Sequence, residues 1–311
     1  MHLKEKLQSC NGPSLSFEFF PPKNEQAATT LYNTIQELEP YQPSFVSVTY
    51  GAGGSNRELT RDVAIKIQQQ TSIPTVAHLT CVGHTRKEIW DILDQYAQAG
   101  VKAVLALRGD PPQGTVNYNH SADEFQHAAD LVAFIRKYND SGNHPDPQGF
   151  AIGVAGFVEG HPATPNRLKE MEYLKAKVDA GADYICTQLF FDNHNFFDFR
   201  ERCLLAGINI PILAGIMPIT SISGMYRMAE LSGGTCFPAR LLKAIKRAGD
   251  DLTAIQEVGI QYASSQCAEL LDNNVAGIHF YTLNKSLATR EIYRNLGLKN
   301  SRQLLINSKN N

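Results

Sequence analysis

The sequence predicts an α/β protein built as a (β/α)8 barrel (a TIM barrel), with an extra helical segment before the last strand. Eight short apolar runs alternate with helical stretches along the 311 residues. Several helical stretches end in Ala-Gly directly before the next strand, at positions 99–100, 180–181 and 206–207, where glycine fits the left-handed cap of a short loop. Eight such units favour a closed barrel. A doubly wound open sheet is the alternative, but no GxGxxG motif follows the first strand.

The elements follow from the apolar pattern. Strands are expected at 16–20, 45–50, 75–81, 103–107, 151–157, 184–190, 212–216 and 277–283. Helices are expected at 24–38, 57–70, 86–98, 122–138, 166–180, 195–205 and 222–231, with a longer one at 250–273 and a last one at 285–296. The strand runs have few polar interruptions, which is typical of a parallel sheet buried on both faces. Residues 1–311 are expected to form a single domain.

Composition excludes several classes of protein. The hydrophobic content of 43% allows a large core. A net charge of −2 without a basic block argues against nucleic acid or a membrane surface as the main partner. The N-terminal stretch MHLKEKLQSC lacks the apolar core of a signal peptide. The six scattered cysteines show no zinc spacing, so we expect reduced thiols, no metal site and a cytoplasmic location.

Polar residues stand where the predicted strands end. In the stretch ALRGDPP, residues 106–112, a buried strand stops abruptly at Arg108, Gly109 and Asp110. Alone, this stretch would be interpreted as an ordinary Gly-Asp-Pro turn. Other strands carry polar groups at or near the same end, namely Glu18, Thr49, His78, His161, Gln188 and Tyr281. Because the carboxyl ends of barrel strands meet at one face, we expect a ligand site there.

Glu18 is the most suggestive single residue. Strand alternation puts Ser16 and Glu18 on one face and Phe17 and Phe19 on the other. A carboxylate walled by aromatic rings would have a raised pKa and could donate a proton near neutral pH. The equally weighted alternative pairs Glu18 with a basic neighbour inside the barrel. Asp110 offers a second carboxylate, so that one acid could donate a proton and the other stabilise charge.

Other candidates carry less weight from pattern alone. The glycines at 51–54 with Ser55 could cradle a phosphate, but a plain loop is the better interpretation. We interpret His78 as a hydrogen-bonded core histidine rather than a metal ligand. Lys177 is expected to be a solvated helix residue. The residues therefore indicate a barrel enzyme with a carboxylate pair, and its reaction stays open.

Eight sequence motifs along the chain give more information about its family. In order, these are SFEFFPPK (16–23), FVSVTYGAGGS (45–55), AHLTCVG (77–83), LALRGDPP (105–112), GHPAT (160–164), KVDAGADYICTQLFFD (177–192), GIMPI (215–219) and HFYTLNK (279–285). In this order and spacing the chain resembles the methylenetetrahydrofolate reductases, in particular the short bacterial type that consists of the catalytic barrel. The long extension that binds S-adenosylmethionine in eukaryotic relatives is not expected, nor is control by that ligand.

The resemblance implies a chemistry. FAD would bind at the carboxyl end of the barrel, making residues 1–311 a catalytic FAD-binding domain. NADH or NADPH would reduce the flavin and leave, and methylenetetrahydrofolate would then take the hydride and become 5-methyltetrahydrofolate, feeding methionine synthesis. A homo-oligomer is also implied. The alternatives are another FAD-dependent barrel dehydrogenase, or a cofactor-free barrel lyase or methyltransferase, because a fold does not determine function.

The resemblance also assigns roles to residues. Glu18 would be the general acid that protonates the folate nitrogen, and Asp110 would stabilise the resulting cation. The implied cofactor contacts are Thr49, His78, Arg108, Gly109, Asp110, Ala128, Phe157, His161, Glu170, Lys177 and Ala182. The implied substrate contacts are Glu18, Gln188, Met228, Tyr281, Leu283 and Lys285.

The chain departs from the family pattern at four positions. Phe157 and His127 stand where relatives often carry tyrosine. Glu170 stands where some relatives have aspartate, and Met228 where a stacking phenylalanine can occur. These positions leave one flavin contact and the stacking partner of the nicotinamide or folate undecided.

Overall fold

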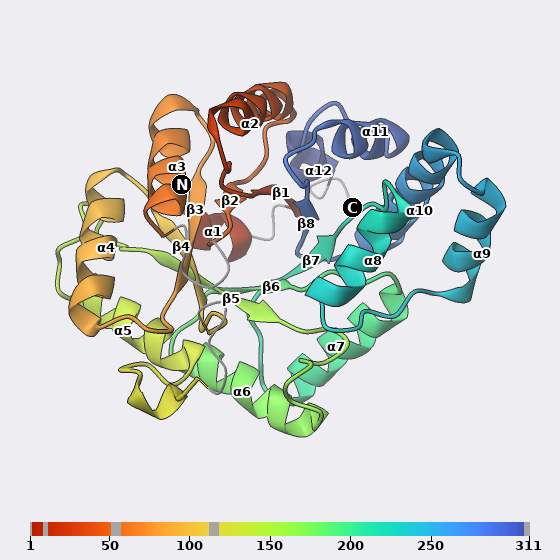
Figure 1. Cartoon of the computed structure of the whole chain (residues 1–311). Helices are drawn as coiled ribbons and strands as arrows, with labels where there is room; N and C mark the ends of the chain where they lie inside the picture. The colour runs from red at the N-terminus through yellow and green to blue at the C-terminus, as the bar shows by residue number, and fades with distance from the viewer. Residues whose placement is uncertain (1, 9–11, 51–56, 112–117, 308–311) are drawn as a thin grey trace.

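The structure is a computed structural model that describes residues 2–8, 12–50, 57–111 and 118–307. Eight parallel strands form a closed barrel in sequence order, with β8 pairing back to β1 (Figure 1). The strands are β1 (Ser14–Phe19), β2 (Val46–Val48), β3 (Thr75–Thr80), β4 (Ala103–Leu107), β5 (Ala151–Gly156), β6 (Tyr184–Thr187), β7 (Ile212–Ile216) and β8 (Gly277–Tyr281). The predicted (β/α)8 barrel is confirmed.

Helices surround the barrel (Figure 1). They are α1 (Leu3–Gln8), α2 (Glu25–Leu38), α3 (Arg57–Gln70), α4 (Arg86–Gln98), α5 (Ala128–Asp140), α6 (Arg167–Asp179), α7 (Asn193–Leu205), α8 (Ile222–Leu231), α9 (Ala239–Ala248), α10 (Leu252–Asp272), α11 (Leu287–Asn295) and α12 (Arg302–Asn307), with short 3-10 helices at Glu39–Tyr41 and His120–Ala122. The extra helical segment before the last strand consists of α9 and α10. None of these helices in the described ranges is both long and apolar enough to cross a bilayer.

Helix starts follow from capping side chains. At α4, Thr85 Oγ1 accepts the backbone N–H of Glu88, and the Glu88 carboxylate accepts the backbone N–H of Thr85. The prediction of a helix from residue 122 is wrong, because α5 begins at Ala128. The Asp130 carboxylate accepts the backbone N–H groups of Gln126 and His127, at 2.8 and 2.9 Å, which sets the start of the helix there.

Several strands end earlier than the apolar pattern predicts. The run expected to reach residue 283 stops at Tyr281, because Leu283 and Asn284 adopt φ values of 52° and 58°. Left-handed backbone cannot continue a strand. The Asn284 side chain instead bonds the backbone N–H and carbonyl of Phe20, at 2.8 and 2.9 Å. The carboxyl ends of the strands therefore leave the sheet as ordered loops.

The outer face of the barrel packs against the helices. Phe17 and Phe19 point outward from β1 and are fully buried in one apolar cluster with Leu31 and Ile35 of α2. Burying large apolar side chains between sheet and helices is the main stabilising contribution in this architecture. Because Phe17 and Phe19 face outward, their neighbour Glu18 faces the barrel interior.

Helix α1, which the sequence pattern did not predict, packs at the amino end of the barrel. Leu3 and Leu7 join an interior cluster with Phe45 of the loop before β2. Lys4 Nζ lies 3.0 Å from the buried carboxylate of Asp183, just before β6. The amino end is thus filled by apolar side chains, and polar interior groups such as Glu18 gather toward the carboxyl end.

Candidate active site

A cavity of about 620 Å³ opens at the carboxyl ends of the strands. Its volume lies within the range of sites for small molecules and cofactors. Its lining comes from β1, β3–β6 and β8 with the loops that follow them, and from α5 and α6. The polar lining residues are Glu18, His78, Arg108, Asp110, His127, His161, Thr164, Glu170, Tyr173, Lys177, Cys186, Gln188 and Tyr281.

The segment after β4 forms one wall of this cavity. Gly109 has φ of 86°, and a Cβ at this position would lie 2.8 Å from Thr80 Cβ and 2.9 Å from Val82 Cγ1. Only glycine fits this close approach. Among the described residues, the Arg108 guanidinium has no hydrogen bond or ion pair, and Asp110 lies exposed at the rim. A free cation and a carboxylate thus face the cavity together.

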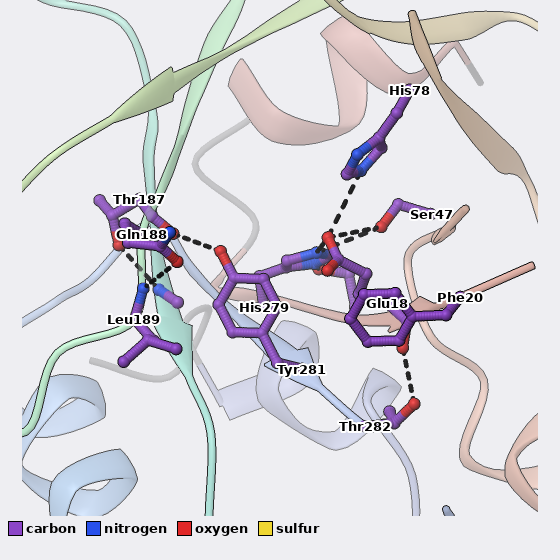
Figure 2. A network of polar contacts seen from close by, with 12 residues as sticks. Glu18, Phe20, Ser47, His78, Thr187, Gln188, Leu189, His279, Tyr281 and Thr282 are labelled. Carbon is purple, nitrogen blue, oxygen red and sulfur yellow. Dashed lines mark hydrogen bonds and ion pairs between the residues drawn. The ribbon is translucent and has the colours of Figure 1, made fainter. Parts of the chain in front are cut away.

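Glu18 is only 5% exposed and meets two histidines (Figure 2). Its Oε2 lies 3.4 Å from Nε2 of His279 and 3.4 Å from Nε2 of His78, and it accepts a 3.5 Å hydrogen bond from Ser47 Oγ. Burial alone would raise the pKa of Glu18. The hydrogen bonds and charges of His279 and His78 outweigh burial and lower the pKa of Glu18 to about 2.

The prediction of a raised pKa for Glu18 is therefore wrong. It assumed that aromatic rings wall the carboxylate, but Phe17 and Phe19 lie on the other side of the sheet. The alternative interpretation, an acid paired with basic neighbours inside the barrel, matches the structure.

His279 was missed by the sequence reasoning. Its Nδ1 lies 2.7 Å from Ser16 Oγ, and its Nε2 contacts Glu18 and Ser47. Ser16 also reaches the carbonyl of Ile278 at 3.4 Å. Because both ring nitrogens have partners, the orientation of the imidazole is fixed. The sequence pattern could have identified His279. It lies two residues before Tyr281 in HFYTLNK, and side chains two residues apart on a strand point to the same face.

Gln188 and Tyr281 occupy the side of the cavity next to Glu18 (Figure 2). The Tyr281 hydroxyl donates a 2.6 Å hydrogen bond to the carbonyl of Thr187, which fixes its ring. Gln188 Oε1 accepts the N–H of Leu189 at 2.9 Å. The Gln188 amide nitrogen has no hydrogen-bond partner within the described chain, so its donors are available to a ligand.

Helix α6 presents Glu170, Tyr173 and Lys177 to the cavity, at helical spacing. Lys177 Nζ donates a 2.6 Å hydrogen bond to the carbonyl of Ala155. Burial lowers the pKa of Lys177 to about 8, with Glu170 acting in the opposite direction. Burial also raises the pKa of Glu170. The expectation of a solvated Lys177 is wrong, because the barrel brings β5 against this turn of the helix.

Most of the residues implied by the resemblance meet at this cavity. Of the cofactor set, His78, Arg108, Gly109, Asp110, Ala128, Phe157, His161, Glu170 and Lys177 line it, and of the substrate set, Glu18, Gln188 and Tyr281 do. Thr49 and Ala182 are not part of the described lining. Thr49 follows β2 and bonds Thr60 through its carbonyl, and Ala182 lies before β6, at the opposite end of the barrel.

The rest of the substrate set is not part of the described lining of the cavity. Met228 and Leu283 belong to an apolar cluster with α9 and α10, and Lys285 is exposed beyond β8. The glycines at 51–54 and Ser55 lie outside the described residues.

The fold and this site together define a (β/α)8-barrel enzyme in which the Glu18 carboxylate contacts His279 and His78 beside the cavity. Residues 3–297 match the family described as methylenetetrahydrofolate reductase, and the chain belongs to this family. It is 36% identical over 297 residues to the 5,10-methylenetetrahydrofolate reductase of Buchnera aphidicola, covering 95% of this chain and 96% of that protein.

Longer relatives and a solved structure also match. Methylenetetrahydrofolate reductase (NADH) 1 of Arabidopsis thaliana is 40% identical over 295 residues, covering 92% of this chain and 48% of that protein. The chain thus spans about half the length of the plant and yeast relatives it matches. An uncharacterized Clostridium thermocellum protein that binds two copies of 5-methyl-5,6,7,8-tetrahydrofolic acid has a TM-score of 0.64 at 13% identity, over 94% of this chain and 96% of that one. That likeness shows the fold alone.

Proposed function

We propose that this chain reduces 5,10-methylenetetrahydrofolate to 5-methyltetrahydrofolate with NADH or NADPH, through FAD, and so feeds methionine synthesis. One observation carries the proposal: the family match extends along the barrel, and Glu18, Asp110 and Gln188 from its separate motifs line one cavity. Bacterial relatives of nearly the same length bear the name 5,10-methylenetetrahydrofolate reductase.

The charged and polar residues that line the cavity fit FAD. Arg108 has no side-chain partner among the described residues, and Lys177 is a half-buried cation on the cavity wall, so both suit an anionic diphosphate. His78 lies on the cavity wall, where its Nε2 contacts Glu18 at 3.4 Å, and it would meet the flavin from this side. Ala128, Phe157, His161 and Glu170 would complete the cofactor wall. When bound, FAD supplies hydride transfer between the nicotinamide and the folate, in two separate half-reactions.

Glu18 and His279 would hold the proton that the folate requires. Because contact with the histidines keeps Glu18 ionised in the free site, Glu18 must take up a proton before it acts as the acid, and His279, bonded to Ser16, is placed to pass one to it. A pterin that enters the cavity removes water from the Glu18 carboxylate and so disfavours the charged form of Glu18. Proton transfer from His279 to Glu18 and on to the folate nitrogen then opens the methylene bridge to an iminium cation, the hydride acceptor.

Two further side chains would steer the same step. Asp110, a carboxylate at the rim, stabilises the iminium cation by charge. The free amide donors of Gln188 orient the pterin ring. Tyr281, fixed by its hydrogen bond to Thr187, would contact the pterin from the same side of the cavity as Gln188.

The test is a visible absorption spectrum of the purified protein, followed by anaerobic addition of NADH and then methylenetetrahydrofolate. We expect a flavin spectrum that bleaches with NADH and returns with the folate. Flavin that bleaches but does not return would indicate another FAD-dependent barrel dehydrogenase. A colourless protein that cannot be reconstituted with FAD would overturn the proposal and favour a lyase.

A further inference from the structure

The chain turns sharply soon after β8. Leu283 and Asn284 both adopt left-handed backbone, with φ of 52° and 58°, and among the described non-glycine residues they are the one adjacent pair that does so. A bulky residue such as leucine is rare in this region, and such a conformation persists only where surrounding contacts enforce it. The turn is therefore held in place by specific contacts.

Asn284 makes these contacts with the residue that follows β1. Its Oδ1 accepts a 2.8 Å hydrogen bond from the backbone N–H of Phe20, and its Nδ2 donates a 2.9 Å hydrogen bond to the Phe20 carbonyl. Thr282 Oγ1 donates a 2.6 Å hydrogen bond to the carbonyl of Glu18 (Figure 2) and accepts the N–H of Asn284 at 3.2 Å. From α2, Thr34 Oγ1 donates a 3.1 Å hydrogen bond to the carbonyl of Asn284. We call the two hydrogen bonds between Asn284 and Phe20 the Asn284 clamp.

The Asn284 clamp extends the pairing of β1 with β8 beyond the ends of the two strands. The last paired residues of the ladder are Glu18 and Tyr281. Left-handed backbone at 283 and 284 cannot continue the ladder, and the side-chain amide of Asn284 pairs with both backbone groups of Phe20 instead. The end of β1 and the loop after β8 are therefore joined.

The two joined segments belong to the substrate side of the proposed site. The Glu18 carboxylate contacts His279 of β8 at 3.4 Å. Leu283, within the turn, packs with the apolar cluster that contains Met228, and Lys285 directly follows the turn. The residues proposed to hold the cofactor line the cavity instead from β3, from β4 and β5 with the loops that follow them, and from α5 and α6.

From this arrangement we infer that Asn284 is a positioning residue for folate reduction, an inference that rests on the proposed function. A general acid must lie within hydrogen-bond reach of the atom that it protonates, and a displacement of about 1 Å can reduce the rate by about 100-fold. The clamp holds the end of β1, which carries Glu18, against the loop that carries Leu283 and Lys285, the implied folate contacts. Hydride transfer from the nicotinamide to the flavin does not use these groups, so the clamp acts on the folate half-reaction.

The main variant is Asn284→Gly, because glycine adopts a φ of 58° without strain and only the clamp is lost. In anaerobic stopped-flow absorbance of the FAD-loaded chain, folate reduction at saturating methylenetetrahydrofolate should slow by about 10- to 100-fold, and flavin reduction by NADH by less than about twofold. Asn284→Asp keeps the acceptor for the Phe20 N–H and loses the donor to the Phe20 carbonyl, so we expect a smaller loss of folate reduction, of about threefold to tenfold.

The matched control is Asn274→Gly. Asn274 is also a left-handed asparagine, with φ of 55°, but it lies in the loop before β8, at the amino end of the strand. Its replacement removes the same side chain without touching the clamp. Both half-reactions of Asn274→Gly should therefore keep their rates within about twofold.

Amide hydrogen exchange tests the clamp without catalysis. In a peptide covering residues 17–24, Pro21 and Pro22 carry no amide hydrogen, so few amides compete with that of Phe20. We expect one amide of this peptide to exchange at least about tenfold faster in Asn284→Gly than in the unaltered chain. Asn284→Asp and Asn274→Gly should show no such change, because both keep an acceptor for the Phe20 N–H.

Unchanged folate reduction in Asn284→Gly would overturn the inference, and so would equal losses in both half-reactions, which indicate a merely structural role. If Asn284→Gly does not retain FAD, Asn284→Asp decides: a loss confined to folate reduction supports the inference, and no loss or an equal loss overturns it. An unaltered chain that does not reduce the folate counts against the proposed function instead. Faster exchange at Phe20 in Asn284→Gly would then still support the clamp, whereas unchanged exchange would overturn it.

Discussion

Replacing Glu18 by glutamine tests the proton path most directly. The amide keeps the shape of the side chain but removes the charge that His279 and His78 contact at 3.4 Å. General acid catalysis contributes about 10²–10⁴ in rate, or roughly 3–5 kcal/mol of barrier. We therefore expect Glu18→Gln to slow folate reduction by at least about 100-fold. Flavin reduction by NADH needs no such proton, so its rate should change by less than about threefold.

The same variant gives a stability prediction with a definite sign. The pKa of Glu18 is lowered from 4.5 to about 2 in the folded chain. A lowered folded-state pKa stabilises the protein above the unfolded value, and this contribution is lost as pH falls toward 2. The difference between the unfolded and folded pKa values of Glu18 corresponds to about 3 kcal/mol of folding stability at neutral pH. In urea unfolding, the difference in free energy of unfolding between the unaltered chain and Glu18→Gln should therefore shrink from pH 7 to pH 3.

The assay is anaerobic stopped-flow absorbance of each half-reaction. Ser47→Ala serves as the control, because it removes the longest of the three contacts to Glu18, at 3.5 Å, and leaves the acid in place. We expect it to slow folate reduction by less than about fivefold. Normal folate reduction by Glu18→Gln would remove Glu18 from the acid role. Equal losses in both half-reactions would mean that Glu18 positions the flavin instead.

Three other substitutions probe the surrounding structure. Asp110→Asn should slow folate reduction more than flavin reduction in the same assay, and equal losses would indicate general flavin positioning. Asp183→Asn leaves the Arg136 guanidinium, 2.6 Å from the buried carboxylate, without its counter-charge. Urea unfolding should show a loss of about 2–4 kcal/mol, and a loss below about 1 kcal/mol would contradict this. Gly109→Ala places a methyl group 2.8 Å from Thr80 Cβ at a φ of 86°. It should cost about 1–3 kcal/mol of stability and weaken FAD binding in a fluorescence titration, and an unchanged protein would refute this close approach.

Much of the fold could be predicted from the sequence, because the signals are local. Apolar strand runs alternate with helical stretches eight times, three of the helical stretches end in Ala-Gly, and eight such units favour a closed parallel barrel. The polar residues after the strands, such as Arg108, Asp110 and Gln188, were expected to converge, because every parallel strand points its carboxyl end to the same face. The structure places all three on one cavity.

Other features depend on distant contacts. The low pKa of Glu18 arises from His279, 261 residues away along the chain, and from His78 on β3. Burial of Lys177 requires β5 to lie against α6. Helix α1 is too short to be predicted from periodicity, and it is held by interior residues such as Phe45. The sequence by itself thus determined the barrel, the end that carries the site and most of its polar residues. Only the tertiary structure decided which of those residues share a proton or a charge, because desolvation and pairing are properties of neighbours in space.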